Sequence, residues 1–344
     1  MTRVAVLILH APAGPSAGPL VTAFESIRRR NAERQAAGFR AAGADEIRID
    51  DRPLDSGGFG GRVREAAETG DGGLVVLGSG SIALATAAER RAFVAIAAGS
   101  PGHALVNNRY SADIVAVSGA AAVLVGLPDL ASDNGLPRWL TENAGVEVAD
   151  LRSRWRLQVD LDSPLDAVLV GRPVDAAGAV RAALARVVAV THDPKLELIV
   201  SGRTSAAGLA WLERSTASRT RALIEERGFR TRSPEQRAVA STLGMLLARE
   251  GPESLGSILA RLGDAALVDS RVLMAQQFGP DERGWPGAED RFASDLLLPD
   301  RIADPWLRAL TAAARDASIP IILGGHSLVG PGLRLVLARG RSWT

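Results

Sequence analysis

The stretch LVVLGSGS, residues Leu74–Ser81, is an apolar run that ends in a short segment of glycine and serine. The opening stretch VAVLIL, residues Val4–Leu9, has the same character and precedes a loop rich in proline and glycine. Short apolar runs bounded by Gly or Pro are typical of strands that are buried on both faces of a sheet. Because segments with helical apolar spacing lie between such runs, the sequence predicts an α/β fold with a mostly parallel or mixed sheet and helices on both faces.

The first half of the chain continues this alternation. Its expected strands are Val4–Leu9, Glu46–Ile49, Leu74–Leu77, His103–Val106, Asp113–Val117 and Gln158–Leu161. Its expected helices are Leu20–Ala42, Arg62–Glu68, Ala87–Ala98 and Ser132–Ala144. Gly43 suits the left-handed position that commonly follows a helix C-terminus.

The second half repeats the pattern, which predicts a further α/β region. Its expected strands are Leu196–Val200, Ala222–Glu225, Ala265–Asp269 and Ile319–Leu323. Its expected helices are Ala206–Ser215, Pro234–Glu250, Glu253–Leu262 and Pro305–Ala317. The polar, Gly- and Pro-containing stretch Phe278–Arg291 predicts a loop. A length of 344 residues fits one large domain or two ordinary ones. We place the first domain at residues 1–180, and an α/β extension or second domain of unknown role at residues 181–344.

Composition excludes several classes of protein. The chain has no cysteine, which excludes disulfides, Cys-zinc sites and iron–sulfur clusters. Lys195 is the only lysine among 40 basic residues, and no glycine-rich loop ends in Lys-Ser or Lys-Thr, which excludes a Walker-type phosphate loop. A net charge of +1 and an aromatic content of 4% argue against a nucleic-acid partner. No apolar run reaches ~18 residues and the N-terminal run is too short for a signal peptide, so we expect no membrane association and a cytoplasmic location.

Three stretches of the first half share their order and residue types with one known superfamily. They are AGADEI at Ala42–Ile47, LVVLGSGS at Leu74–Ser81 and VDLDSPLD at Val159–Asp166. Together they resemble the MobA-like nucleotidyltransferases, which share their fold with nucleotide-sugar glycosyltransferases. The corresponding family segments are an "AGADEV"-type turn, a strand that ends in a metal-binding Asp, and a "VDVDTPEDL" segment. The resemblance covers residues 1–175, and the second half is not recognised.

The resemblance implies a transferase that binds a nucleoside triphosphate over the carboxyl ends of the strands, with Mg²⁺ bridging the phosphates. A small phosphorylated acceptor would attack the α-phosphorus and release pyrophosphate. This chemistry depends on positioning and charge neutralisation more than on a strong base. The first loop and the glycine-rich stretch would contact the nucleotide through Gly14, Gly57, Gly58 and Gly60. The expected metal ligands are Asp113, Asp160 and Asp162.

Two features of this chain depart from the family pattern. The first loop, His10–Pro19, contains no Arg or Lys, although the family uses these residues to hold the triphosphate. The metal-binding Asp expected after Leu77 is replaced by Gly78–Ser81. These departures favour a second hypothesis, in which the protein binds a nucleotide or another phosphorylated ligand in a regulatory role and has lost catalysis.

Each polar candidate in the first half also has an ordinary structural interpretation. Ser79, Gly80 and Ser81 could bind phosphate before a helix, or form a common glycine turn. Asn107 and Asn108 belong to a polar segment between two expected strands, which is either a ligand-binding loop or a hairpin turn. The two metal candidates at positions 160 and 162 lie at the end of an expected strand and should project the same way, but an Asp-Ser-Pro sequence is also an ordinary helix start.

The second half contains two similar strand ends. Arg203 and Ser205 follow one apolar run, and His326 and Ser327 follow another, so both pairs should lie at the carboxyl edge of a sheet. They predict either a second anion site or tight turns with Ser as helix caps. A third hypothesis is therefore a hydrolase or transferase in which Arg203 supplies charge and His326 acts as a donor or general base. His10, also at a strand end, is the second histidine candidate.

The remaining charged and aromatic clusters are typical of structural roles. Arg28–Arg30 lies inside an expected helix and is more typical of a solvated face than of a site. Four tryptophans are more typical of core or interface anchors than of ligand-stacking residues: Trp139, Trp155, Trp211 and Trp306. The sequence leaves homo-oligomer formation open.

Overall fold

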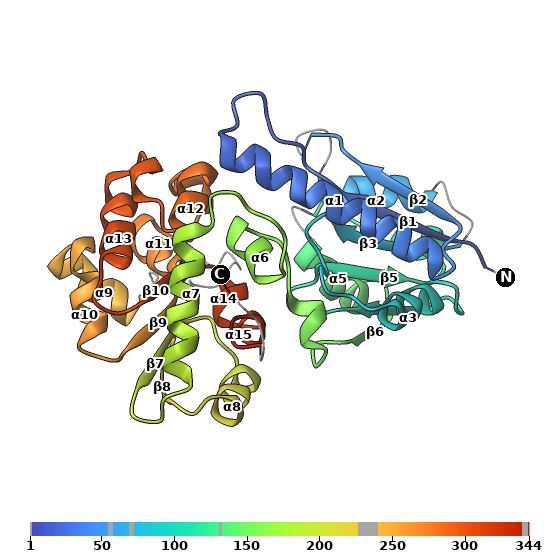
Figure 1. Ribbon diagram of the computed structural model, residues 1–344. Helices are drawn as coiled ribbons and strands as arrows, with labels where there is room; N and C mark the ends of the chain where they lie inside the picture. The colour runs from blue at the N-terminus through green and yellow to red at the C-terminus, as the bar shows by residue number, and fades with distance from the viewer. Residues whose placement is uncertain are drawn as a thin grey trace. The chain divides into compact units, whose positions relative to one another are not determined.

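The computed structural model describes residues 2–53, 58–68, 72–130, 133–225, 240–338 and 343, and it confirms the α/β fold. The chain divides into two compact units, which are seen in Figure 1. Unit 1 comprises Met1–Ala17 and Thr22–Leu161, and unit 2 comprises Gly18–Val21 and Asp162–Thr344. Residues 180 and 181, between which the domain boundary was expected, lie inside helix α7 (Gly178–Thr191), which packs on the strands of the second sheet in unit 2.

Unit 1 is built on a mixed sheet with the strand order β2-β1-β3-β5-β4-β6. The strands are β1 (Val4–Leu9), β2 (Glu46–Asp50), β3 (Gly73–Gly78), β4 (His103–Val106), β5 (Ile114–Val117) and β6 (Glu147–Asp150). Strand β1 pairs in parallel with β2 and β3, whereas β5 runs antiparallel to both β3 and β4. The first three strands therefore end at the same edge, where the loops that follow them can form a site.

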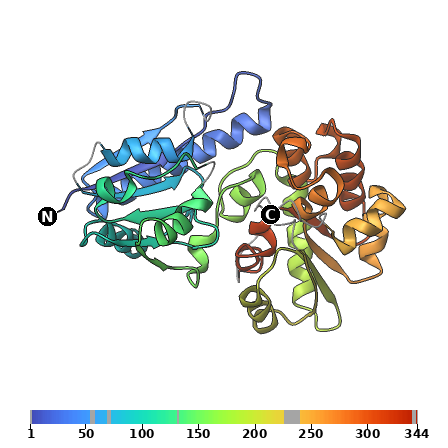
Figure 2. The same ribbon diagram turned by 180° about the vertical axis from the view of Figure 1, so that it is seen from behind.

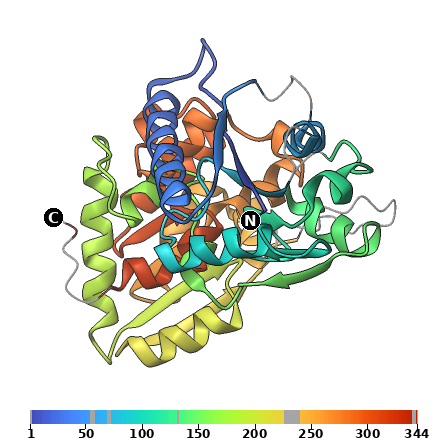
Figure 3. The same cartoon turned by 90° about the vertical axis from the view of Figure 1, so that its right-hand side faces the viewer.

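Helices cover both faces of this sheet. They are α1 (Pro19–Ala41), α2 (Phe59–Glu68), α3 (Ala87–Ala97), α4 (Ala120–Leu124) and α5 (Leu136–Glu142), with the short 3₁₀ helices η1 (Asp133–Gly135) and η2 (Trp155–Gln158). Apolar residues of α1 and α3 share one core with alternate strand residues, and those of α2, α4 and α5 share a second core with the others. In Figure 3, α1 in dark blue and α2 in lighter blue lie on either side of the blue strands. Gly43 has φ +100°, as expected after a helix end.

The strand expected at Gln158–Leu161 is wrong. Trp155–Gln158 forms η2 instead, and the sixth strand is β6, which the sequence did not predict. Val159 and Leu161 are both buried, but they pack on the turn after β3, where Leu161 N–H donates to the carbonyl of Gly80 at 3.1 Å. The alternating pattern was therefore a signal of burial and not of strand pairing. As a consequence, the premise that Asp160 and Asp162 share a strand end is also wrong.

Unit 2 contains a parallel sheet with the strand order β10-β9-β7-β8. The strands are β7 (Glu197–Gly202), β8 (Arg219–Ile224), β9 (Ala265–Asp269) and β10 (Ile321–Gly324). The longer helices are α6 (Pro164–Leu169), α7 (Gly178–Thr191), α8 (Ala206–Ser215), α9 (Thr242–Glu250), α10 (Leu255–Ala260), α11 (Ser270–Phe278), α12 (Ala288–Asp295) and α13 (Pro305–Arg315). The shorter ones are η3 (Pro252–Ser254), η4 (Glu282–Gly284), η5 (Pro299–Arg301), α14 (His326–Val329) and α15 (Leu333–Val336).

Helix α7 packs across β7, β9 and β10, and α12 and α13 pack against β10 (Figures 1 and 2). These three strands are almost completely buried, which agrees with their uninterrupted apolar sequence. Among the described residues, no helix is long and apolar enough to cross a membrane.

Three other sequence expectations need correction. Helix α5 begins at Leu136, after η1, so the helix expected from Ser132 is shorter; residue 132 itself lies outside the described residues. The expected loop at Phe278–Arg291 contains η4 and the start of α12. Part of the helix expected at Pro234–Glu250 also lies outside the described residues, and the described part is α9.

Candidate functional site

A pocket of about 390 Å³ opens at the carboxyl ends of β1 and β3 in unit 1. Its lining residues come from β1 and the loop after it, from α1, α2, β3, β5 and η1: Leu9, His10, Ala11, Arg28, Gly58, Phe59, Arg62, Val76, Leu77, Gly78, Asp113, Ile114, Val115 and Asp133. This lining combines an apolar surface with a few charged groups, which is the usual character of a small-molecule site. The size is also within the range of such sites.

Arg28 contributes a cation to this pocket from α1. Its Nε atom is buried and has no hydrogen-bond partner among the described residues. A side chain at Gly80 would place its Cβ 3.4 Å from this nitrogen, so the guanidinium lies against the turn that follows β3. Arg28 was expected to lie on a solvated helix face, and it instead lines the pocket. Positive charge that the first loop lacks is thus supplied by α1.

His10 is the first residue after β1 and is only 2% exposed. Its backbone N–H donates to the carbonyl of Asp50 at 2.8 Å, which holds the residue against the end of β2. The ring nitrogen Nε2 lies 2.7 Å from Oε1 of Glu25 on α1. The other ring nitrogen, Nδ1, is buried and has no hydrogen-bond partner in the described part of the chain. Nε2 of His10 therefore has a hydrogen-bond partner in the protein, whereas Nδ1 has none among the described residues.

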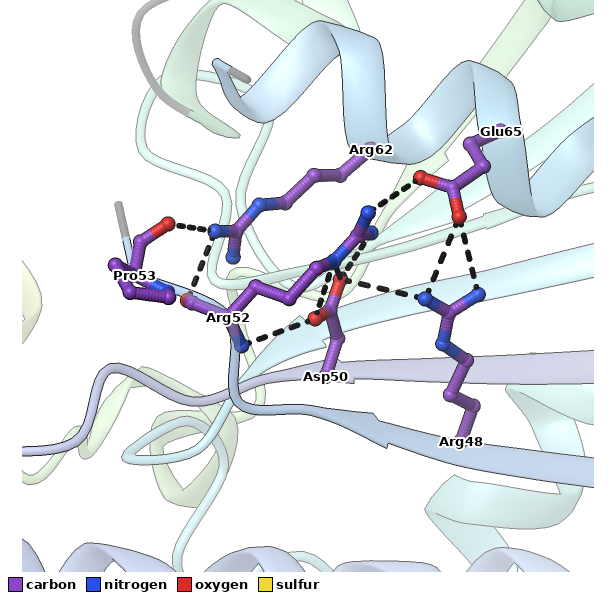
Figure 4. Close-up of polar contacts among 6 residues, drawn as sticks. All are labelled: Arg48, Asp50, Arg52, Pro53, Arg62 and Glu65. Carbon is purple, nitrogen blue, oxygen red and sulfur yellow. Dashed lines mark hydrogen bonds and ion pairs between the residues drawn. The ribbon is translucent and has the colours of Figure 1, made fainter. Parts of the chain in front are cut away.

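Arg62 reaches the pocket from α2 and is held by the loop that follows β2. Its Nη2 donates to the carbonyl oxygens of Arg52, at 2.8 Å, and of Pro53. Figure 4 shows that Arg52 is itself fixed by a bidentate contact with Asp50 and by Glu65 on α2. Hydrogen bonds from Arg52 hold the pKa of the Asp50 carboxyl below its usual range, although burial opposes this. The network connects the end of β2 to α2 on one side of the pocket.

The expected metal ligands are only partly found at the pocket. Asp113 lines it, and Asn107 Nδ2 donates to its Oδ2 at 2.6 Å. Asp160 lies on the segment that packs on the turn after β3, and Asp162 starts the main segment of unit 2. Within the described ranges, no group of three or more His, Asp or Glu residues could hold a metal ion. Asp133, which the sequence did not single out, is the second carboxylate of the pocket lining.

Most of the glycine and serine candidates in unit 1 have clear packing roles. A Cβ at Gly60 would lie 2.1 Å from the carbonyl oxygen of Pro128, so this position requires glycine for close packing. Gly58 lines the pocket, and a Cβ there would meet only the side-chain carboxylate of Asp129. Gly14 is exposed, and a Cβ added there would meet nothing within 4 Å. Gly57 lies outside the described residues.

The turn after β3 is pinned from behind by α1. Asn31 Nδ2 donates to the carbonyl of Ser79 at 2.8 Å, and Gln35 Nε2 donates to that of Ile82 at 2.9 Å. Ser79 and Ser81 are buried, and Gly80 approaches the carbonyl oxygen of Leu161 too closely for a side chain. Helix α3 starts only at Ala87 and has a capping box of its own. These contacts hold the backbone of the turn in place, which is a structural role.

The Asn107–Asn108 segment closes the connection between β4 and β5. Asn107 is fully buried, and its side chain accepts the N–H of Asp113 at 2.9 Å and donates to the carbonyl of Leu157 at 3.0 Å. Asn108 accepts the N–H of Tyr110 at 3.1 Å, which is an Asx turn. Asn107 therefore orients Asp113, and Asn108 shapes an exposed turn.

The strand ends of unit 2 are organised around buried ion pairs. Arg203 Nε lies 2.6 Å from Asp269 Oδ2 at the end of β9, and Ser205 caps α8 by accepting the N–H of Gly208. His326 keeps part of its surface exposed. Desolvation by the neighbouring protein, followed by the positive charge of Arg203, lowers the pKa of its imidazole below the usual value. Ser327 is buried. The Arg203 guanidinium, which the sequence suggested as a ligand for an anion, is therefore already paired with the carboxylate of Asp269.

Three residues of the site, Glu25, Arg28 and Asp133, were not candidates from sequence. Glu25 and Arg28 lie within α1 and Asp133 lies in η1, so their only sequence signal was their charge, which many solvated residues share. No protein-family model matches this chain, and comparison with curated proteins finds no match either. The geometry of the pocket therefore carries the functional argument.

Proposed function

We propose that the unit 1 pocket binds a nucleotide through its phosphates, and that the protein transfers the nucleotidyl group to a small acceptor. The observation that carries this proposal is that Arg28, a residue of the pocket lining, has a buried Nε with no partner among the described residues. A buried donor without a partner costs on the order of 1–3 kcal/mol, and more when it is charged. An anionic ligand would supply the missing acceptor. The position at the strand ends is where open α/β sheets bind nucleotides.

The apolar part of the lining supports a ligand with a flat ring. Phe59 supplies an aromatic side chain, and Leu9 and Leu77 supply aliphatic surface in the same pocket. Aromatic and aliphatic walls favour a nucleobase, whereas the guanidinium favours phosphate. The pocket thus has an apolar surface that suits the base and a charged group that suits the phosphate of a mononucleotide.

The carboxylates of the pocket fit a magnesium ion that is bound together with its substrate. Asp113 and Asp133 are the oxygen donors of the lining. Mg²⁺ commonly uses one or two carboxylates and completes its coordination with phosphates and waters, so two suffice. Such an ion would neutralise charge on the phosphates and on the leaving pyrophosphate.

A second candidate function is nucleotide binding without transfer. It is favoured by Asp113, whose carboxylate already accepts a hydrogen bond from Asn107 at 2.6 Å. Under this alternative Arg28 provides the charge for the phosphates, and no metal is required. The two candidates differ in their dependence on Mg²⁺ and in whether pyrophosphate is formed.

Calorimetric titration with ATP, GTP, CTP and UTP, with and without Mg²⁺, tests the site. The expected result is that at least one nucleotide binds, and that Arg28→Gln weakens the affinity about tenfold or more, as loss of a charged hydrogen bond would. Arg30→Gln, an exposed position on the same helix, is the matched control and should bind like the wild type. Equal binding by the two variants would contradict the proposal. A pyrophosphate assay with phosphorylated acceptors then separates transfer from binding alone.

A further inference from the structure

The two ring nitrogens of His10 differ in their hydrogen-bond partners. Nε2 is 2.7 Å from a carboxylate oxygen of Glu25, whereas Nδ1 is buried without a hydrogen-bond partner among the described residues. When Glu25 is ionised it accepts a hydrogen bond, so Nε2 carries the proton. The neutral ring then has its lone pair on Nδ1. A carboxylate that fixes the tautomer of a histidine in this way is the usual arrangement for an imidazole that accepts a proton.

His10 belongs to the lining of the pocket that would hold the proposed ligand. His10 lines the same pocket as Arg28, and it does so with a side chain that is almost completely buried. The other charged groups of the lining are Arg62, Asp113 and Asp133. The arginines would hold phosphate oxygens, which leaves His10 as the candidate base of the pocket. An unsatisfied buried nitrogen is destabilising unless a ligand or water binds it.

We propose that His10, oriented by Glu25, is the catalytic base of this pocket; the inference rests on the proposed nucleotidyl transfer. The attacking oxygen of the acceptor forms a bond to the α-phosphorus. The bond between that phosphorus and the bridging oxygen of the leaving pyrophosphate breaks, and this oxygen keeps the electron pair. The proton of the attacking oxygen passes to Nδ1 of His10 and gives an imidazolium beside Glu25, and its later release to solvent restores the neutral ring.

This role also defines the acceptor class. A base is useful only if the attacking oxygen carries a proton, as in a hydroxyl group or a phosphate monoanion. A fully ionised phosphate would need no base. Because the second pKa of a phosphate monoester is ≈ 6, a phosphate acceptor should depend on His10 less and less as the pH rises above this value, whereas a hydroxyl acceptor should still need the base there. Parallel assays with phosphorylated and hydroxyl acceptors therefore distinguish the two sources of the proton.

The test compares turnover and nucleotide binding in four variants. His10→Asn should lower turnover by about 10²–10⁴-fold, the range for loss of a general base, with nucleotide affinity changed by less than about threefold. The pH dependence that this base gives to turnover should disappear in this variant. Glu25→Gln, which removes the positioning carboxylate, should lower turnover by about tenfold or more and alter the pH profile. The matched controls are His103→Gln and Glu33→Gln, at exposed positions, and both should behave like the wild type.

Three outcomes would overturn the inference. Nucleotide binding that falls in parallel with turnover in His10→Asn would make His10 a binding or structural residue. A covalent nucleotidyl adduct on His10, seen by mass spectrometry, would make it a nucleophile. Nucleotide binding by the wild type with no turnover on either acceptor class would overturn the catalytic role and leave the binding site standing. Absence of any nucleotide binding would overturn the proposed function itself.

Discussion

Both units place arginine side chains near the ends of parallel strands, the region in which open α/β sheets bind ligands. In unit 2, Arg203 and Arg271 are engaged by carboxylates that are fully buried. In unit 1, Arg28 lines a pocket with a buried nitrogen that has no partner among the described residues. The difference teaches that position in the fold does not by itself identify a binding site. The more informative property is whether the protein has already neutralised the charge that it places there.

The largest expected effect comes from breaking a deeply buried pair of unit 2. Arg271 Nη1 lies 2.5 Å from Oδ1 of Asp295, and the Asp295 side chain has 0% exposure. Asp295→Ala leaves the guanidinium without its counter-charge in a buried position. We expect the free energy of unfolding to fall by about 3–5 kcal/mol, measured by urea denaturation. Asp300→Ala removes an exposed carboxylate that pairs with Arg315 and should cost less than about 1 kcal/mol. Equal losses for the two variants would mean that the first pair is not buried in solution.

The second prediction compares the loss of one arginine from each unit. Arg203→Gln removes the partner of a fully buried carboxylate, and we expect a loss of about 2–3 kcal/mol in unfolding free energy with no change in nucleotide affinity. Arg28→Gln should do the reverse, with a stability change below about 1 kcal/mol and a loss of binding of about tenfold or more. Denaturation and calorimetry on both proteins provide the four measurements. If Arg203→Gln weakens nucleotide binding instead, the assignment of the site to unit 1 is wrong.

The third prediction concerns a buried carboxyl of unit 2 with an incomplete set of hydrogen bonds. Asp166 is 3% exposed; its Oδ2 accepts the N–H groups of Asp162 and Ser163, but Oδ1 has no partner among the described residues. Burial raises its pKa to about 8, and the negative charges of Asp162 and Asp295 add to this effect. The folded state therefore binds the proton more tightly than the unfolded chain, in which the carboxyl has its ordinary pKa of 3.8.

The folded state should therefore lose stability as this carboxyl ionises. Asp166 contributes most to stability below the unfolded pKa of 3.8, and this contribution is lost as the pH rises through the folded value of about 8. Asp166→Asn mimics the protonated form and cannot ionise. We expect the variant to gain stability relative to the wild type as the pH rises from 3.8 to about 8, by on the order of 1 kcal/mol or more. Denaturation midpoints across this pH range measure the difference. A difference that does not change with pH would contradict the raised pKa.

Much of the fold could be predicted from the sequence because strong apolar patterns depend on local residues. Helix α1, expected at Leu20–Ala42, spans Pro19–Ala41, and β1 and β9 match the expected strands at both ends. The exception at Gln158–Leu161 has a physical cause. Its two apolar residues are buried against a turn, and one-sided burial produces the same alternation in a segment that pairs with no strand.

The candidate site was harder to predict because it depends on contacts between distant residues. The sequence indicated that Arg203 follows a strand, but its partner Asp269 lies 66 residues away on another strand. Arg28 belongs to a run of three arginines, and only the orientation of α1 decides which of them meets the pocket. No recognisable motif links Glu25 to His10, since the two meet across a loop and a helix.

The smallest effect is expected in the ion network of Figure 4, where Arg48 and Arg52 contact the same two carboxylates, Asp50 and Glu65, but Arg48 does so at longer distances. Arg48 is 43% exposed and lies 3.4 Å from Glu65, so Arg48→Gln should cost less than about 1 kcal/mol and leave nucleotide binding unchanged. Arg52 instead makes a bidentate contact with the buried carboxylate of Asp50, and its carbonyl oxygen accepts a hydrogen bond from Arg62 at the pocket. Arg52→Gln should therefore weaken both stability and binding, as measured by denaturation and calorimetry. Equal effects of the two substitutions on affinity would show that the network acts on the pocket through net charge rather than through the position of Arg62.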